Sequence, residues 1–317
     1  MSYTAIYPVL IAFLLNLILG PLVIPCLSRL KLGQYVRDDG PKSHLQKAGT
    51  PTMGGVIILL SLVLTSLLFV RSHPEILPII LLTVGFGIVG FLDDYIKIVK
   101  KQSLGLRAYQ KMIAQILITG IFGYYLLQYT DIGTSVILPF TKGKQIDLGI
   151  AFIPVLFFGM IGTVNGVNLT DGLDGLAASV TVLVATFFAV VSWGEGSSLL
   201  PVATAGVGSL LGFLLFNAHP ARVFMGDTGS LALGGFVAAI AFMLKMPLFL
   251  PIVGLIYVVE TVSVMIQVLY FKKTRKRFFK MAPIHHHFEL SGWVETKVVA
   301  VFCILTAIFC LIGLIAL

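Results

Sequence analysis

The sequence predicts an all-α polytopic membrane protein with about ten transmembrane helices, organised as a single domain over residues 1–317. Hydrophobic residues make up 57% of the chain and charged residues only 11%, whereas soluble domains carry roughly 25% charged residues. The mean hydropathy is +1.00. About ten apolar runs divide the chain, each close to the ~20 residues that a helix needs to span the hydrocarbon core of a bilayer.

The apolar runs place the helices in chain order. The first run follows no positive residue and is longer than the apolar core of a signal peptide, so we expect a retained span. After the fourth run, residues 134–140 and 144–148 flank a turn at 141–143 and predict a short surface β-hairpin. The expected spans cover residues 5–28, 51–70, 76–97, 108–128, 150–167, 174–193, 199–216, 229–245, 248–271 and 297–317.

Positive residues set the expected orientation. If the N terminus lies outside, the inner loops contain all but four of the 22 lysines and arginines, as the positive-inside rule requires. Both termini and the hairpin are then expected outside. The net charge of +8 matches basic inner loops that face anionic membrane lipid, and no nucleic-acid motif accompanies it. The four residues left outside are Arg71, Lys142, Lys144 and Lys245.

Acidic residues gather at the inner ends of the spans. The third span ends in FLDDY at 91–95, where the side chains of Asp93 and Asp94 point about 100° apart on a helix. We therefore expect them to have different roles. Lys97 follows three and four residues later, so an ordinary surface ion pair is the competing interpretation.

The stretch NGVNLTDGLDGL at 165–176 holds two more aspartates between two apolar runs. Asn168, Asp171 and Asp174 recur every three residues and would share one face if the sixth span began early. Alternatively, Asp171 merely caps that span. Because an aspartate at the bilayer centre is costly, we expect this stretch to form the floor of a wet active site.

Two further motifs lie in the last two inner loops. Asp227, in FMGDTGS at 224–230, sits where the N-cap of the eighth span is expected, but an aspartate beside glycines and backbone amides also suits a metal and a phosphate. PIHHHFEL at 283–290 contains His285, His286 and His287. Three consecutive histidines cannot all face one metal from a regular helix, so we favour an anionic ligand over zinc.

Together these motifs predict five carboxylates at one inner surface. Their mutual repulsion requires that some are protonated or that a hard cation is present. Oxygen ligands with cationic side chains nearby favour Mg²⁺, held partly by a substrate pyrophosphate. The pattern therefore predicts phosphoryl transfer at a membrane surface by a group comprising Asp93, Asp94, Asp171, Asp174 and Asp227.

The motifs resemble a known family. PTMGG at 51–55, FLDDY, NLTDGLDGLA at 168–177, FMGDTGS and PIHHHFEL are similar to those of phospho-N-acetylmuramoyl-pentapeptide transferases, within the polyprenyl-phosphate N-acetylhexosamine-1-phosphate transferase superfamily. The resemblance implies ten transmembrane helices, a homodimer, and an active site on the cytoplasmic face of the bacterial inner membrane. It implies that UDP-N-acetylmuramoyl-pentapeptide and undecaprenyl phosphate give lipid I and UMP.

The resemblance also implies roles for individual residues. Asp227 and Asp171 would hold Mg²⁺, and Asp93, Asp94, Asp227 and His285 would be catalytic. Gly172, Leu173, Asp174, Phe224 and Lys47 would surround the uridine. The remaining residues expected to bind substrate are Thr52, Lys97, Lys111, Asn168, Asp171, Asn217, Gly226, His286 and His287.

Two mechanisms are compatible with these residues. Asp93 takes a proton from the lipid phosphate for direct attack, or an aspartate first forms a covalent phospho-sugar intermediate. We predict direct attack, because an ionised phosphate needs little activation. For the lipid, we expect the long run 248–271, with Pro251 and Gly254, to tilt or bend and leave an apolar groove, and Glu260 either serves there or pairs inside the bundle.

Two rival functions remain at this stage. One is a sister enzyme that transfers N-acetylglucosamine-1-phosphate to the same lipid, against which the triple histidine argues. The other is a transporter with an ion site at mid-membrane, which would need charged residues in mid-span. Only Glu260 is placed to suit a transporter.

Overall fold

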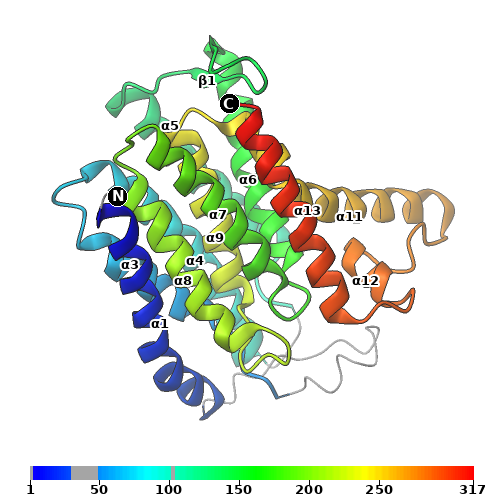
Figure 1. Ribbon diagram of the computed structural model, residues 1–317. Coiled ribbons are helices and arrows are strands. Elements are labelled where there is room, and N and C mark those ends of the chain that lie inside the picture. The colour runs from blue at the N-terminus through cyan, green and yellow to red at the C-terminus, as the bar shows by residue number, and fades with distance from the viewer. Residues whose placement is uncertain (1–2, 30–48, 101–103) are drawn as a thin grey trace.

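The computed structural model describes residues 3–29, 49–100 and 104–317. Within those ranges, nine helices are long and apolar enough to cross a membrane, which agrees with a polytopic membrane protein (Figure 1). Lys47, expected near the uridine, lies outside the described residues.

The elements follow one another in a mostly helical order. They are α1 (Tyr3–Arg29), α3 (Gly55–Leu67), η1 (Pro74–Ile76), α4 (Leu77–Val99), α5 (Ala108–Tyr129), β1 (Ser135–Ile137), β2 (Gln145–Asp147), η2 (Gly149–Ala151), α6 (Phe152–Thr170), α7 (Leu176–Gly194), α8 (Leu200–Asn217), α9 (Gly226–Met243), η3 (Pro247–Phe249), α10 (Leu250–Val253), α11 (Leu255–Thr274), α12 (Ile284–Glu289) and α13 (Glu295–Ile315).

The helix α3 is shorter than the expected span 51–70. Its 13 residues rise only about 20 Å, less than the ~30 Å thickness of the hydrocarbon core. The reason lies in the preceding residues, which pair with the α8–α9 loop instead of extending the helix. Phe224 N–H donates to the Pro51 carbonyl at 2.8 Å, and Gly54 N–H donates to the Phe224 carbonyl at 2.8 Å. This pairing ties the PTMGG motif to the FMGDTGS motif.

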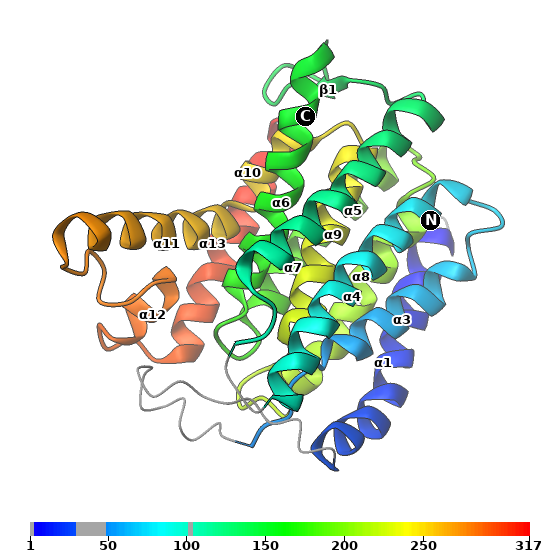
Figure 2. The same cartoon turned by 180° about the vertical axis from the view of Figure 1, so that it is seen from behind.

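Helix α9 forms the centre of the bundle (Figure 2). It packs against α3, α4, α6 and α7. Of the residues in its apolar stretch, 83% are buried inside the protein, whereas the share is 22% for each of α1, α11 and α13. Glycines allow the close contacts: a Cβ added at Gly90 of α4 would lie 2.0 Å from the Asp227 carbonyl oxygen, and one at Gly55 of α3 would lie 2.1 Å from Gly229 N. The start of α9 is therefore pressed against the ends of two other helices.

The expected span 248–271 is broken into α10 and α11. Gly254, with φ −98° and ψ 27°, ends the first and precedes the second. Helix α11 then projects away from the bundle, as both views show (Figures 1 and 2). Its apolar side chains Val262, Met265 and Leu269 are exposed. The expected bend is present, whereas the lipid groove along it stays a prediction.

The hairpin consists of β1 and β2, which pair antiparallel with Val136 opposite Ile146. Beyond the strands, Leu138 N–H still donates across the hairpin to the Lys144 carbonyl at 2.9 Å, and Phe140 N–H donates to the Ala316 carbonyl at 2.7 Å. The start of α1 and the end of α13 point to the same end of the bundle as the hairpin (Figure 1). Which side of the membrane this end faces stays a prediction.

Candidate active site

Four helix ends meet at the end of the bundle opposite the hairpin. Helix α4 ends with Asp93, Asp94 and Lys97, and α9 begins with Gly226 and Asp227. Lys111 lies in the first turn of α5, and Asn168 lies in the last turn of α6. Because these four helices pack side by side, residues far apart in the sequence come together here.

Two lysines bridge the carboxylates of α4 and α9. Lys97 Nζ lies 2.6 Å from Asp93 Oδ2 and 3.1 Å from Asp227 Oδ2. Lys111 Nζ lies 3.2 Å from Asp93 Oδ1 and 2.5 Å from Asp227 Oδ2. The expected pair between Lys97 and Asp93 is present, but it is not an ordinary surface pair, because the Asp93 carboxylate is buried and a second helix supplies another acid.

Asp93 and Asp94 do have different contacts, as their positions on α4 predict. Asp93 Oδ1 also accepts the Leu106 N–H at 2.8 Å. Asp94 turns to the start of α9, where it accepts the N–H of Asp227 at 3.2 Å, the N–H of Thr228 at 2.9 Å and the Thr228 hydroxyl at 2.7 Å. Asp94 thus satisfies amides that a helix start leaves without partners. We interpret it as a residue that positions α9.

The N-cap interpretation of Asp227 is wrong. Asp227 is the second residue of α9, and the N-cap position belongs to Met225. Its carboxylate faces the site, where Oδ1 accepts the Asn168 side-chain amide at 3.0 Å. Asn168 also donates to Ser230 Oγ at 2.8 Å, which fixes the amide toward Asp227.

The turn between α6 and α7 separates residues that were expected on one face. Helix α6 ends at Thr170 and α7 begins at Leu176, so the sixth span does not begin early. The cap interpretation of Asp171 is wrong as well, because Gly175, with φ +73°, occupies the N-cap of α7. Asp171 instead lies near the Gly226 backbone N–H, which favours the charged form of its carboxyl.

Asp171 nevertheless lies close to the acidic cluster. Burial, reinforced by the negative charges of Asp227 and Asp94, raises the pKa of the Asp171 carboxyl to about 8. A carboxyl with such a pKa is largely protonated at neutral pH unless a cation replaces the proton.

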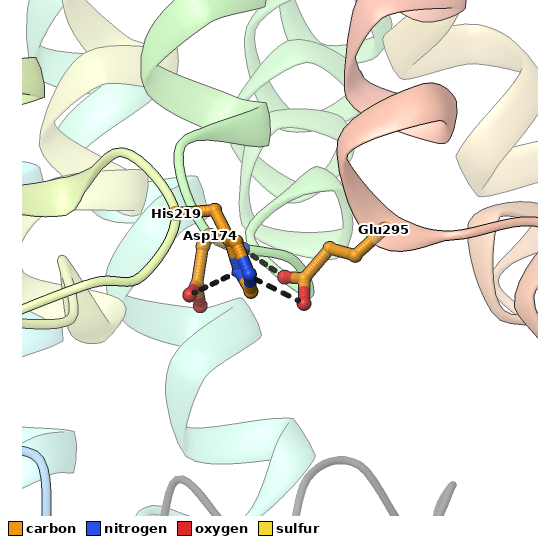
Figure 3. A group of neighbouring side chains, drawn as sticks. All are labelled: Asp174, His219 and Glu295. Atoms are coloured by element: carbon orange, nitrogen blue, oxygen red, sulfur yellow. Dashed lines mark hydrogen bonds and ion pairs between the residues drawn. The ribbon is translucent and has the colours of Figure 1, made fainter.

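The five expected carboxylates form two groups rather than one. Asp93, Asp94 and Asp227 each place an oxygen within 4.8 Å of the others. Asp174 belongs to a second group with His219 and Glu295 (Figure 3). Sequence reasoning missed His219 and Glu295. His219 could have been found between Asn217 and Phe224, but Glu295 lies two residues before the last expected span and belongs to no motif.

Comparison with known proteins decides the family. A family model described as Glycosyl transferase family 4 matches residues 76–245, and one described as Phospho-N-acetylmuramoyl-pentapeptide-transferase signature 1 matches residues 47–59. A phospho-N-acetylmuramoyl-pentapeptide-transferase from Clostridium kluyveri is 56% identical over 317 residues, covering 99% of this chain and 100% of the relative. This chain belongs to the phospho-N-acetylmuramoyl-pentapeptide-transferase family.

Other members show similar agreement. The proteins of that name from Clostridium botulinum and Caldicellulosiruptor bescii are 55% and 53% identical, over 99% and 98% of this chain and 97% and 96% of their own lengths. The similarity therefore extends over the whole transferase and is not confined to the acidic motifs.

In this transferase the three histidines have three different partners. His285, fully buried in α12, places Nδ1 3.0 Å from Glu260 Oε1. His286 Nδ1 lies 2.8 Å from Glu289 Oε2, and His287 Nδ1 accepts the Lys280 N–H at 3.1 Å. Their separate partners agree with the expectation that they do not share one metal. Glu260 thus pairs inside the bundle, one of the two roles expected for it.

The remaining expected residues line the same end of the transferase. A Cβ added at Gly172 would lie 2.1 Å from His285 Nε2, and one at Gly226 would lie 2.8 Å from Thr52 Oγ1, so each glycine contacts a motif from another loop. Asn217 is buried and donates to the Val223 carbonyl at 2.9 Å, so its side chain holds its own loop. Leu173 is buried and Phe224 is half-buried.

Proposed function

We propose that this chain transfers phospho-N-acetylmuramoyl-pentapeptide from UDP-N-acetylmuramoyl-pentapeptide to undecaprenyl phosphate, giving lipid I and UMP. Its membership of the family supports this substrate pair. The observation that carries the proposal is the convergence of Lys97 and Lys111 on Asp93 and Asp227, with Nζ to carboxylate distances of 2.5–3.2 Å. Two cations at the end of a membrane bundle suit a reaction between two phosphates.

The main task of the protein is to position the phosphates and to neutralise their charge. A phosphate oxygen of the lipid forms a bond to the sugar-linked phosphorus, and the bond from that phosphorus to the UMP oxygen breaks. UMP leaves with the electron pair of that bond. Lys97 and Lys111 lie where they can exchange a carboxylate partner for phosphate oxygens, because their side chains are 30% and 22% exposed.

Direct attack by the lipid phosphate fits the contacts better than a covalent aspartyl intermediate. Asp93 is held by both lysines and by the Leu106 N–H. Asp227 is held by both lysines and by Asn168. A nucleophilic aspartate would have to leave these partners, whereas Asp93 as a proton acceptor keeps them. A phospho-sugar aspartyl adduct isolated after incubation with the nucleotide alone would overturn this choice.

The donor set at this site fits Mg²⁺. The carboxylates of Asp93, Asp94 and Asp227 lie together, and with Asp171 they outnumber the two lysines, so the group retains negative charge when ionised. Among the residues that the structure describes, this group offers carboxylate oxygens as ligands, which Mg²⁺ prefers. Asp227 and Asp171 would hold the ion, with Asp93 beside them. When bound, the ion supplies charge neutralisation for the pyrophosphate and for the UMP leaving group.

The site is proposed to face the cytoplasm from the bacterial inner membrane, and the enzyme to work as a homodimer. The basic residues near this end support the orientation: Lys97, Lys100, Arg107 and Lys111 surround the ends of α4 and α5. Helix α11, which projects from the bundle with apolar side chains exposed, is the proposed guide for the undecaprenyl chain.

Discrimination between nucleotides tests the proposal. Purified protein in detergent receives undecaprenyl phosphate and either UDP-N-acetylmuramoyl-pentapeptide or UDP-N-acetylglucosamine, and released UMP is measured. We expect UMP with the first nucleotide only. Release with UDP-N-acetylglucosamine alone would assign the chain to the sister activity, and release with neither would contradict both.

A further inference from the structure

The turn 171–175 is held from three sides. Asp171 lies near the Gly226 backbone N–H at the start of α9, and Gly172 packs against the His285 ring of α12. At its far edge, Asp174 contacts His219 from the α8–α9 loop and Glu295 from α13 (Figure 3). A turn without regular structure thus has its shape set by other elements.

Glu295, the first residue of α13, contacts both other members of this group. Its Oε1 accepts the Asp174 backbone N–H at 2.6 Å. Its Oε2 lies 3.5 Å from His219 Nδ1. The Glu295 side chain is only 10% exposed, so water competes poorly for these contacts. Helix α13 is in this way fastened to the turn by a charged hydrogen bond, the stronger class of such bonds.

His219 completes the group from the opposite side. Its Nδ1 lies 3.2 Å from Asp174 Oδ2, which also accepts the Ala221 N–H at 2.9 Å. The Asp174 carboxylate is 3% exposed, so these donors compensate for its lost hydration. His219 therefore stands between two carboxylates, one on the turn and one on α13.

A cation site is the other interpretation of this group, since the three ligand atoms lie within 4.8 Å of one another. The hydrogen bonds argue against it, because Glu295 Oε1 and Asp174 Oδ2 already accept backbone N–H groups. These hydrogen bonds connect the turn 171–175, the α8–α9 loop and α13, and they therefore stabilise the conformation of the turn.

We propose that Glu295 and His219 are positioning residues that hold the turn 171–175 in the shape that binds the nucleotide. This inference rests on the proposed function and on the expectation that Gly172, Leu173 and Asp174 surround the uridine of the nucleotide. In this proposal both residues act through Asp174, which they contact directly. Their loss should therefore weaken binding of the nucleotide and leave binding of the lipid and the chemical step nearly unchanged.

The test compares Glu295→Ala with Glu295→Gln. KM for each substrate and kcat are measured, together with the Kd of UMP by calorimetry in the absence of lipid. With Ala, we expect nucleotide KM and UMP Kd to rise about tenfold, as the loss of one hydrogen bond to a charged group implies. Gln keeps an acceptor for the Asp174 N–H, so its increase should be only about threefold.

Three further variants make the test specific. Glu195→Gln, the same substitution at an exposed residue that follows α7 at the other end of the bundle, should leave every constant unchanged. His219→Gln should raise nucleotide KM, and His219→Gln combined with Glu295→Ala should raise it by less than the product of the single effects. Added Zn²⁺ or extra Mg²⁺ should not restore the nucleotide KM of the Glu295 and His219 variants.

The outcomes separate the two proposals. If the wild-type protein releases no UMP, the proposed function fails. If it is active but Glu295→Ala leaves nucleotide KM and UMP Kd unchanged, or lowers kcat and raises both KM values alike, the positioning role fails. A wild-type nucleotide KM that depends on a cation, with that dependence lost in Glu295→Gln, would favour a cation site instead.

Discussion

Lys111 Nζ lies 2.5 Å from Asp227 Oδ2, although the two residues are 116 positions apart in the chain. The contact joins the first turn of α5 to the first turn of α9. Lys97 reaches the same oxygen at 3.1 Å from α4. Two lysines from different helices thus contact the same carboxylate oxygen. The charged group proposed to bind the substrate phosphates is therefore assembled from three helices and not from one sequence motif.

Lys111→Gln should lower kcat by about 10²–10³-fold, the usual cost of removing one charge-stabilising donor from an active site. The side chain remains long and polar, so the fold should survive. UMP release and thermal unfolding in detergent check both points. Lys100→Gln, at an exposed position after α4, is the matched control, and equal activity losses in the two variants would contradict the specific role.

Gly90→Ala should abolish activity and destabilise the protein. The new Cβ would lie 2.0 Å from the Asp227 carbonyl oxygen, so α4 and α9 must separate, at a cost of about 1–3 kcal/mol. Gly85→Ala, on the same helix, places its Cβ 3.7 Å from Ile118 and should be tolerated. Comparable activity and melting temperature for the two variants would show that the close approach is not required.

Asp94→Ala should lower stability as well as activity. It leaves the N–H groups of Asp227 and Thr228 and the Thr228 hydroxyl without their acceptor, a loss of about 1–3 kcal/mol. Thr228→Val removes only one of these hydrogen bonds and should have a smaller effect. Thermal unfolding measures the stability of both variants. An Asp94→Ala protein as stable as the wild type would contradict the role of Asp94 in stabilising the start of α9.

The pKa of Asp171 predicts a pH dependence of stability. The folded state keeps a proton up to about pH 8, whereas the ordinary pKa is 3.8. The free energy of unfolding contributed by this group therefore falls as pH rises between these two values, because the folded state binds more protons there. In EDTA, the melting temperature should fall from about pH 5 to about pH 8 and then level off, and Asp171→Asn should flatten this decline.

Asp147→Asn provides the control for this pH dependence. Hydrogen bonds from the Thr134 hydroxyl and the Gly149 N–H lower the pKa of Asp147, so its titration is complete well below neutral pH. The decline should persist in this variant. A wild-type protein whose melting temperature does not change with pH would contradict the raised pKa of Asp171.

Much of this architecture could be predicted because it follows from local pattern. Apolar runs locate the helices, and Asp93, Asp94 and Asp227 stand at span ends because charge is costly within the bilayer. The helical angle between Asp93 and Asp94 was enough to predict different partners. The break in the span 248–271 was predictable because Pro251 and Gly254 both weaken a long helix.

Other features depend on contacts that no local pattern contains. Asp174 lies outside the cluster of Asp93, Asp94 and Asp227 because α6 ends at Thr170 and Gly175 turns the chain with a positive φ. The short α3 results from pairing of Pro51 with Phe224. Glu295, in the first turn of α13, belongs to no sequence motif, and its contact with Asp174 depends on the packing of α13 beside the turn.

The most direct test of the central claim is a paired assay of lipid I and UMP. Purified wild-type protein and Asp227→Asn receive UDP-N-acetylmuramoyl-pentapeptide and undecaprenyl phosphate, with Mg²⁺ or with EDTA. We predict lipid I and UMP in a one-to-one ratio from the wild type with Mg²⁺, and neither product in EDTA or from the variant. Equal product formation by Asp227→Asn would contradict the assignment of this acid and lysine cluster as the catalyst.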